Sequence, residues 1–525
     1  MSFRTLGLVL VAAALIPSAY TAWIARDMPH VGHFHDDGVY FVCAKSVAEG
    51  KGYRLLSFPG SPYETKYPPL YSMLLAAVWL LNDLFPANLG LATLAAWLAV
   101  PTLIAAARWW VKDFPVGEVE GWVVCAVLAV SPYVAFSGIF LMSDLLLCAL
   151  ILTVLAVAPR PGMAIAAGLL GGAAYLTRTT ALPLLAAIPL WYLTKRRFRD
   201  AAMFAAAMLP AVAGWAVWSA LHRPQVSDPS LFWYFDYAAF YRYDVSLADI
   251  PLIVQRNFET VLVKAAGPFA FHVGDTFLVV HSKRMFLLVA VAGLIRIARR
   301  HGMTPYHWFA VFLLPMTLVY HYPPGERYMM PFYPLLLAGL AAELRHLGGM
   351  LVKTLREKRD FGNRAVATLI LLVVAGFACA ATWVAYAGYQ TAIPGFVEAD
   401  RKQATSNQAV FRWMRENLPA DSTILAYRDP VVYLHTGLKS MRRPGLPMPS
   451  YREDRERALS PFFNLVDFAE QRRLQYLLAT SADWNMELPE EDSKSIRQAL
   501  TKDKRLQAVY SSPDTVLYRL TTVTP

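Results

Sequence analysis

The sequence predicts an α-helical membrane protein with many spans, followed by a small soluble α/β domain at the C-terminus. Hydrophobic residues make up 56% of the 525 residues, the mean hydropathy is +0.37, and only 17% of residues are charged. Soluble chains of this length are rarely so apolar. Apolar runs close to the 20 residues that cross a bilayer recur along residues 1–388. Residues 389–525 hold 19 Lys/Arg and 17 Asp/Glu and contain no such run.

Residues 1–388 are expected to form the transmembrane domain, with about eleven spans. We place the spans near residues 6–24, 88–108, 120–141, 144–158, 163–178, 179–194, 201–221, 283–298, 305–321, 328–345 and 365–388. The first run lacks a small-residue cleavage pattern, so we interpret it as a retained anchor. Residues 70–82 are apolar but short for a span, and a crossing there would invert every later loop. They are therefore predicted to be an interfacial helix, with residues 38–49 as a second one.

The basic residues behind the net charge of +11 are concentrated in alternate loops. With the N-terminus inside, the basic residues fall on inner segments, whereas outer loops 25–87 and 222–282 are balanced or mildly acidic. This is the positive-inside pattern, so the charge indicates orientation and no nucleic-acid partner is expected. Near-absence of N-x-S/T acceptor sites and the short N-terminus favour a bacterial inner membrane.

Residues 389–525 are predicted to form an extracytoplasmic α/β domain. The expected helices are 402–417, 464–473 and 493–503, and the expected strands are 423–427, 475–479, 506–510 and 515–520. This region has no glycine-rich phosphate loop.

The polar loop 25–67 after the first span carries the most informative residues. Asp36 and Asp37 lie just beyond the membrane, where a carboxylate can take a proton from a hydroxyl. They are equally compatible with the N-terminal cap of a helix. His35, with Asp36, is a possible ligand pair for a metal ion, but two histidines, His33 and His35, in a loop are weak evidence, and a solvated loop is the favoured interpretation.

Lys66 precedes Tyr67-Pro68-Pro69, where the prolines predict a rigid, extended entry to the next helix. The lysine could bind the phosphate of a lipid-linked donor or extend to lipid headgroups. Asp144 starts a later span at the outer face, as a site residue or a helix cap. Arg178 and Arg327 also fall at the outer face, where arginines are disfavoured, so anion binding or ion pairing, for example with Glu326, is expected.

An aromatic segment lies in outer loop 222–282. Eight of the thirteen residues 231–243 are aromatic. Sugars stack on aromatic faces, but aromatic side chains also collect at bilayer interfaces, and the interface is the favoured interpretation.

Taken in order, these segments resemble the GT-C glycosyltransferases, specifically the family 39 group of protein O-mannosyltransferases and lipid A aminoarabinose transferases. The resemblance covers most of residues 1–345 and is carried by the following segments: Asp36-Asp37, Ala48–Tyr53, Lys66–Tyr71, Ser143-Asp144, Leu169–Arg178 and Pro324–Tyr328. It implies a polyprenyl-phosphate sugar donor that enters from the membrane.

The resemblance also implies roles for individual residues. Asp36 or Asp37 would be the base on the acceptor hydroxyl, assisted by Asp144, and Lys66 would hold the donor phosphate. Val39 stands where aminoarabinose transferases carry a basic residue, so Arg178 or Arg327 would supply that charge. Tyr67, Glu326 and Tyr328 are the further substrate-binding residues. Some relatives use a divalent metal ion (Mg²⁺ or Mn²⁺) and others do not, so the metal is left open.

The predicted function is therefore an inverting membrane glycosyltransferase that moves a sugar from a polyprenyl phosphate to a lipid, glycan or protein acceptor at the extracytoplasmic face. The alternative is a transporter or flippase of a lipid-linked glycan. Such carriers tend to show repeated halves and helices broken at mid-membrane. Neither an internal repeat nor a mid-membrane charge is seen here, which favours the enzyme. A third reading is an inactive scaffold with a partner-binding outer domain.

Overall fold

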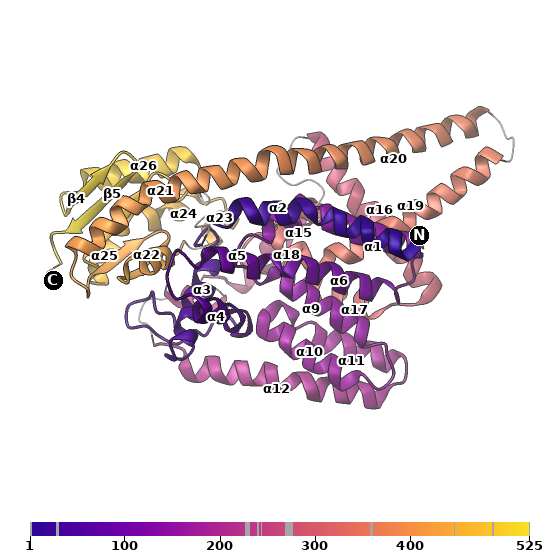
Figure 1. Ribbon diagram of the computed structural model, residues 1–525, viewed down its shortest axis with the longest axis horizontal. Coiled ribbons are helices and arrows are strands. Elements are labelled where there is room, and N and C mark those ends of the chain that lie inside the picture. The colour runs from indigo at the N-terminus through magenta and orange to yellow at the C-terminus, as the bar shows by residue number, and fades with distance from the viewer. Residues whose placement is uncertain are drawn as a thin grey trace.

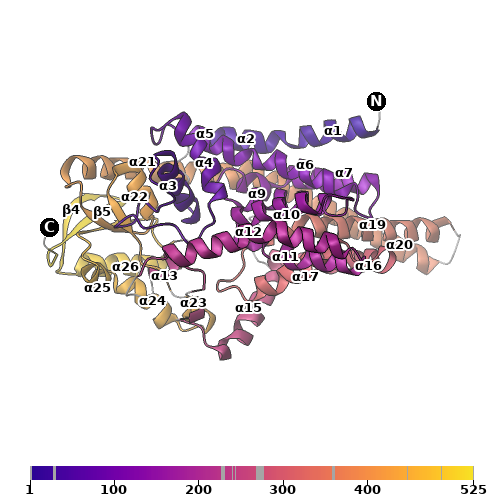
Figure 2. The same ribbon diagram turned by 90° about the horizontal axis from the view of Figure 1, so that it is seen from below.

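The computed structural model shows a helical bundle with a small sheet at one end (Figure 1). The N-terminus lies at the end of the bundle far from the sheet, and the C-terminus lies beside the sheet (Figures 1 and 2). The structure describes residues 3–27, 31–225, 231–238, 241–242, 244–267, 277–356, 361–445, 447–485 and 488–523.

The bundle is built from helices of residues 3–387. Those of the first half are α1 (Phe3–Ala14), α2 (Ile16–Ala25), α3 (Asp36–Ala48), α4 (Leu70–Leu81), α5 (Leu89–Trp97), α6 (Ala99–Val111), α7 (Glu118–Val130), α8 (Pro132–Ser137), α9 (Asp144–Val157), α10 (Ala164–Thr177), η1 (Thr179–Ala181), α11 (Leu184–Thr194) and α12 (Phe198–His222). Those that follow are α13 (Phe232–Phe235), η3 (Leu247–Asp249), α15 (Ile250–Lys264), α16 (Phe277–His301), α17 (Pro305–Leu318), α18 (Glu326–Met329), η5 (Met330–Phe332), α19 (Tyr333–Arg356) and α20 (Phe361–Ala387).

Every predicted span coincides with helical structure, but several are divided between consecutive helices. The run 120–141 is divided at Ser131-Pro132, because Ser131 caps α8 by accepting from the Val134 N–H and Pro132 starts the new helix. The run 328–345 begins with the short α18 and η5 before α19. Among the described residues, four segments are long and apolar enough to cross a bilayer: Arg4–Ala25, Leu89–Val111, Phe198–His222 and Glu326–Lys353. The count of about eleven spans stays a prediction.

The predicted interfacial segments are both helices. At about 1.5 Å per residue, the 12 residues of α4 reach only about 18 Å, well short of the roughly 30 Å hydrocarbon core. Helices α3 and α4 pack against each other beside the sheet end of the bundle (Figure 1). Their length and place therefore agree with a position at one edge of the bundle.

The C-terminal residues form a five-stranded sheet with strand order β2-β1-β3-β5-β4. The strands are β1 (Thr423–Ala426), β2 (Lys439–Met441), β3 (Tyr476–Thr480), β4 (Leu506–Ser512) and β5 (Thr515–Leu520). The helices are η6 (Gly388–Ala392), α21 (Ile393–Asn417), α22 (Asp429–Thr436), α23 (Pro447–Tyr451), α24 (Arg455–Phe463), α25 (Leu465–Gln471) and α26 (Glu490–Lys502). Strands β1, β2 and β3 are parallel, and β5 pairs antiparallel with β3 and β4.

The sequence predicts four of these strands and misses β2, α22, α23 and α24. Strand β2 has only three residues, too few for a periodic pattern. Helix α22 did carry a signal, Pro430 in its first turn and Gly437 in the left-handed conformation at its end.

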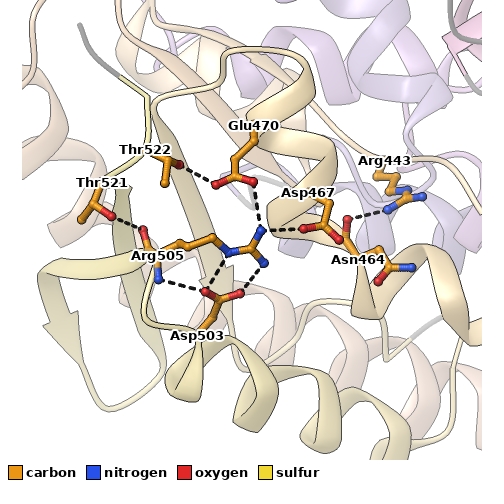
Figure 3. Close-up of polar contacts among 8 residues, drawn as sticks. All are labelled: Arg443, Asn464, Asp467, Glu470, Asp503, Arg505, Thr521 and Thr522. Carbon is orange, nitrogen blue, oxygen red and sulfur yellow. Dashed lines mark hydrogen bonds and ion pairs between the residues drawn. The ribbon is translucent and has the colours of Figure 1, made fainter.

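Arg505 holds the edge of this C-terminal unit together (Figure 3). Its guanidinium bonds Asp503 beside it, and Asp467 and Glu470 on α25. Each exposed pair contributes little alone, but the shared arginine joins the start of β4 to α25, and Thr521 and Thr522 at the end of the chain donate to the Arg505 carbonyl and to Glu470. This network lies in the C-terminal unit and explains how β4, α25 and the end of the chain stay joined.

The predicted inner loops gather at the opposite end of the bundle. A cavity of about 220 Å³ there is lined by Asp113, Pro159, Lys195, His301 and Thr304, which come from four of these loops. Arg197 also donates to the Pro159 carbonyl at 3.1 Å. The basic loops and the polar loop 31–67 therefore occupy different ends of the molecule.

Candidate active site

Asp36 is the first residue of α3 and is held by two partners from distant segments. The Tyr67 hydroxyl donates to Asp36 Oδ1 at 2.5 Å, and Arg327 Nη2 donates to Oδ2 at 2.8 Å. Burial would raise the pKa of Asp36, but Arg327, Arg178 and Lys66 lower it well below its usual range. The Asp36 carboxylate is therefore ionised at neutral pH.

Asp37 faces the chain that precedes it. Its carboxylate accepts from the backbone N–H groups of Gly32 (2.9 Å), His33 (3.1 Å) and Phe34 (3.2 Å). Burial raises the pKa of Asp37 to about 7 despite these donors. Helix α3 begins after His35 without a side-chain cap; Asp36 bonds two side chains, and Asp37 bonds amides that precede the helix. Asp37 thus fixes the loop that presents Asp36.

His35, Asp36 and Asp37 are buried, and His33 and Phe34 are half-buried, which corrects the prediction of a solvated loop. The residues His35, Asp36 and Asp37 are 5%, 6% and 0% exposed. His33 packs against Phe34, and His35 contacts the C-terminal unit. The sequence could not show this, since the covering residues lie almost 400 positions away.

Lys66 is the most unusual cation of the site. The turn that presents it is fixed by Glu64, whose Oε1 accepts from the Lys66 and Tyr67 N–H groups at 2.7 and 3.0 Å. The ammonium lies over the rings of Trp233 (4.0 Å), Tyr67 (5.0 Å) and Tyr237 (5.1 Å). Within the part of the chain that the structure describes, it makes no hydrogen bond and no ion pair.

A buried ammonium without a hydrogen-bonding partner is unfavourable unless something compensates. Only 5% of Lys66 is exposed. Burial lowers the pKa of Lys66 to about 8, with Asp36 and Glu64 opposing the shift. Cation–π contacts to desolvated rings contribute on the order of 2 kcal/mol, less than a buried charge loses on leaving water. The ammonium is therefore suited to receive an anion.

Asp144 and Arg178 form a buried pair next to this group. Arg178 Nη1 and Asp144 Oδ2 are 3.6 Å apart. Neither of these two atoms has a hydrogen-bond partner within the described residues. The Arg178 guanidinium also lies 5.5 Å from the Tyr328 ring. Arg178 is thus ion-paired, which was one of the two predictions for this outer-face arginine. Its positive charge also lowers the pKa of Asp36.

The segment around Arg327 divides into two pairs. Glu326 does not pair with Arg327; it binds Lys264 at 2.8 Å. Arg327 donates to the Tyr328 hydroxyl at 3.1 Å as well as to Asp36, and Tyr328 donates to Tyr320 at 3.0 Å. Arg327 and Tyr328 are therefore hydrogen-bonded around Asp36, whereas Glu326 pairs with Lys264 at the end of α15.

A cavity of about 1070 Å³ joins these side chains. Its lining includes Asp36, Lys66, Tyr67, Arg327 and Tyr328. Asp37, Asp144, Arg178 and Glu326, though close by, are not among its described lining residues. Six lining residues are cationic, against the three carboxylates of Asp36, Glu259 and Glu453; the cations are Lys66, Arg256, Lys264, Arg284, Arg327 and Arg442. Such a cavity favours an anionic ligand.

Trp233, Tyr237 and Arg442 line the cavity but were not among the site residues predicted from the sequence. Trp233 and Tyr237 line the cavity, and Tyr234 and Phe235 are buried, so the favoured placement of the aromatic segment at a bilayer interface is wrong for these residues. Residues 239, 240 and 243 of that segment lie outside the described residues. Arg442 comes from the chain after β2, and only its place in the three-dimensional structure marks it.

The metal-binding reading of His35 and Asp36 fits this geometry poorly. Both Asp36 oxygens are bonded to Tyr67 and Arg327, and His35 Nε2 is 3.0 Å from Asp429 Oδ1. No group of three or more His, Cys, Asp or Glu side chains suited to a metal was found among the described residues. Nearby cations further disfavour a divalent ion.

Comparison with solved structures identifies the fold. ArnT from Cupriavidus metallidurans, bound to undecaprenyl phosphate, aligns with a TM-score of 0.55 and 14% identity over 99% of this chain and 98% of its own. The archaeal oligosaccharyltransferase AglB from Archaeoglobus fulgidus, in complex with an inhibitory peptide and a dolichol-phosphate, aligns with a TM-score of 0.56 and 13% identity over 98% of this chain and 74% of its own. No family model and no curated protein matches the sequence.

Proposed function

We propose that this chain, which has the fold of the GT-C glycosyltransferases, transfers a sugar from a polyprenyl phosphate to an acceptor hydroxyl. The observation that carries the proposal is the buried Lys66 ammonium, which faces the cavity beside the ionised Asp36 without a hydrogen-bonding partner among the described residues. A cation and a base on one cavity are what transfer from a phosphate needs.

We assign binding of the donor phosphate to Lys66 and Arg327, which line the cavity. Arg178 does not line the cavity, but its positive charge adds to theirs. ArnT and AglB have been solved with undecaprenyl phosphate and a dolichol-phosphate, which supports a lipid phosphate as the anion. These cations would stabilise the negative charge that grows on the phosphate oxygen as its bond to the sugar breaks. Trp233 and Tyr237 offer aromatic faces to the sugar.

Asp36 is assigned as the base. The acceptor oxygen attacks the anomeric carbon from the face opposite the phosphate, the bond to the phosphate oxygen breaks with its electron pair, and the acceptor proton passes to Asp36. A carboxylate of low pKa suffices, because the hydroxyl becomes strongly acidic as it bonds to carbon. The configuration is therefore inverted. The acceptor is a lipid, glycan or protein that reaches the cavity.

The proposal is tested by transfer from a panel of radiolabelled polyprenyl-phosphate sugars to cell-envelope acceptors, with the product linkage determined by NMR. We expect one donor to give a product of inverted configuration with release of the lipid phosphate. Because cations of the chain neutralise the phosphate, EDTA should change the rate by less than about twofold. Retained configuration, or a rate that requires Mg²⁺ or Mn²⁺, would contradict this chemistry. Donor binding without turnover would favour a carrier.

The separation of the two ends of the bundle supports an orientation in the membrane. We propose that the basic loops face the cytoplasm of a bacterial inner membrane, and that the cavity and the C-terminal unit lie outside. Single cysteines at two exposed lysines test this: Lys112→Cys at the basic end and Lys494→Cys on α26. An impermeant maleimide should label Lys494→Cys in intact cells and Lys112→Cys only after lysis. The reverse pattern would invert the assignment.

A further inference from the structure

A buried hydrogen bond joins the C-terminal unit to the residue before Asp36. His35 Nε2 is 3.0 Å from Asp429 Oδ1, and Asp429 is fully buried at the start of α22. The second oxygen, Oδ2, accepts from the Tyr234 hydroxyl at 3.2 Å, and the Asp429 carbonyl accepts from Ser440 Oγ at 2.6 Å. Hydrogen bonds from Tyr234 and Ser440 therefore hold Asp429 in place in addition to its contact with His35.

His35 has a backbone conformation that its residue type seldom adopts. Its φ is +62° and its ψ is −50°. A non-glycine residue in such a strained region persists only where its surroundings enforce it. The rings of Trp233 and Tyr234 lie 4.9 and 5.6 Å from the imidazole. Asp36 directly follows His35 and starts α3, so the backbone conformation of His35 sets the position of the Asp36 carboxylate.

Helix α22 approaches the same loop closely on both sides of His35. A Cβ at Gly32 would lie 2.4 Å from Val431 Cγ2, and a Cβ at Gly38 would lie 2.7 Å from Pro430 Cβ. Gly32 also has a φ of +85°, which favours glycine. The sequence thus places a glycine at both of these close approaches of α22, on either side of the His35–Asp429 contact.

We propose that Asp429 is a positioning residue for Asp36, acting through His35, so that docking of the C-terminal unit sets the geometry of the base. The inference rests on the proposed function for Asp36. It assigns the C-terminal unit a part in the transfer step, in addition to covering the cavity. A displacement of about 1 Å at a reacting group can lower a rate on the order of 100-fold.

The test compares Asp429→Asn with a control at the same interface. Lys439→Met removes the contacts of Lys439 Nζ with the Leu56 carbonyl (2.5 Å) and Ser61 Oγ (2.7 Å), which join the two parts away from Asp36. We expect Asp429→Asn to lower kcat by about 10- to 100-fold with the donor KM changed less than about twofold. Lys439→Met should leave both constants near wild type. In a cycle of His35→Ala and Asp429→Ala, the double variant should be no slower than the worse single variant.

Hydrogen exchange of residues 31–41 provides a readout that needs no donor or acceptor. We expect faster exchange in Asp429→Asn and wild-type exchange in Lys439→Met. Wild-type kcat and exchange in Asp429→Asn, or equal losses in both variants, would overturn the inference. If the wild-type protein transfers no sugar, the proposed function fails, and exchange of residues 31–41 still decides whether Asp429 holds the loop.

Discussion

Lys66→Met should weaken the binding of undecaprenyl phosphate by about 30- to 4000-fold. Removing one partner of a buried, close charge pair costs about 2–5 kcal/mol, and each 1.4 kcal/mol is a tenfold change in Kd. Methionine keeps an unbranched side chain that can pack against the rings of Trp233 and Tyr67 but carries no charge, so the loss reports the charge. Binding of the lipid phosphate to protein in nanodiscs measures it.

The same binding should depend on pH in a defined direction. Burial lowers the pKa of Lys66 to about 8, so the free protein carries the ammonium below pH 8 and loses it as the pH rises. Affinity for the phosphate should therefore fall between pH 7 and pH 9. Lys66→Arg, which stays charged, should remove this dependence even where its shape lowers the affinity. Binding by Lys66→Met that equals the wild type at pH 7 would exclude Lys66 from the phosphate site.

Asp36→Asn should lower the transfer rate by about 10²- to 10⁴-fold, the range of a general base. Undecaprenyl phosphate should bind as well as to the wild type or more tightly, because the substitution removes a negative charge from the cavity and weakens the hold of Asp36 on Arg327. Single-turnover transfer from the labelled donor measures the rate. Since Arg327 and its neighbours hold the pKa of Asp36 below its usual range, acidification from pH 7 to pH 5 should not protonate it.

Asp37→Asn is the matched control, because the neighbouring carboxylate is equally buried and bonds backbone N–H groups. We expect this variant to be less stable by about 1–3 kcal/mol but to retain transfer. Full activity of Asp36→Asn together with an inactive, folded Asp37→Asn would reverse the two assignments. Full activity of both variants would remove the first-loop carboxylates from the mechanism.

The helical architecture could be predicted because it depends on local patterns. Apolar runs mark α6, α9, α10 and α12, and the short run of residues 70–82 correctly becomes the 12-residue α4. The break at Ser131-Pro132 could have been read from the cap and the proline. In the C-terminal unit, β5 matches its predicted residues, whereas the three-residue β2 offers no period to detect.

The site could be predicted only in part, for a physical reason. Asp36, Lys66 and Arg327 stand out because charges next to a bilayer require a cause. Sequence alone does not separate Asp36 from Asp37, because their difference lies in which way each carboxylate points. Arg442 and Asp429 reach the cavity region and His35 across almost 400 residues, and no local pattern encodes a contact of that separation.

The central claim is that Lys66 binds the lipid phosphate while Asp36 performs the transfer. The most direct test measures donor binding and single-turnover sugar transfer on the same preparations of wild type, Lys66→Met and Asp36→Asn. We predict that Lys66→Met weakens donor binding by more than about tenfold, and that Asp36→Asn binds the donor at least as well as the wild type but transfers sugar about 10²- to 10⁴-fold more slowly. Transfer by Asp36→Asn at the wild-type rate, or donor binding unaffected by Lys66→Met, would contradict it.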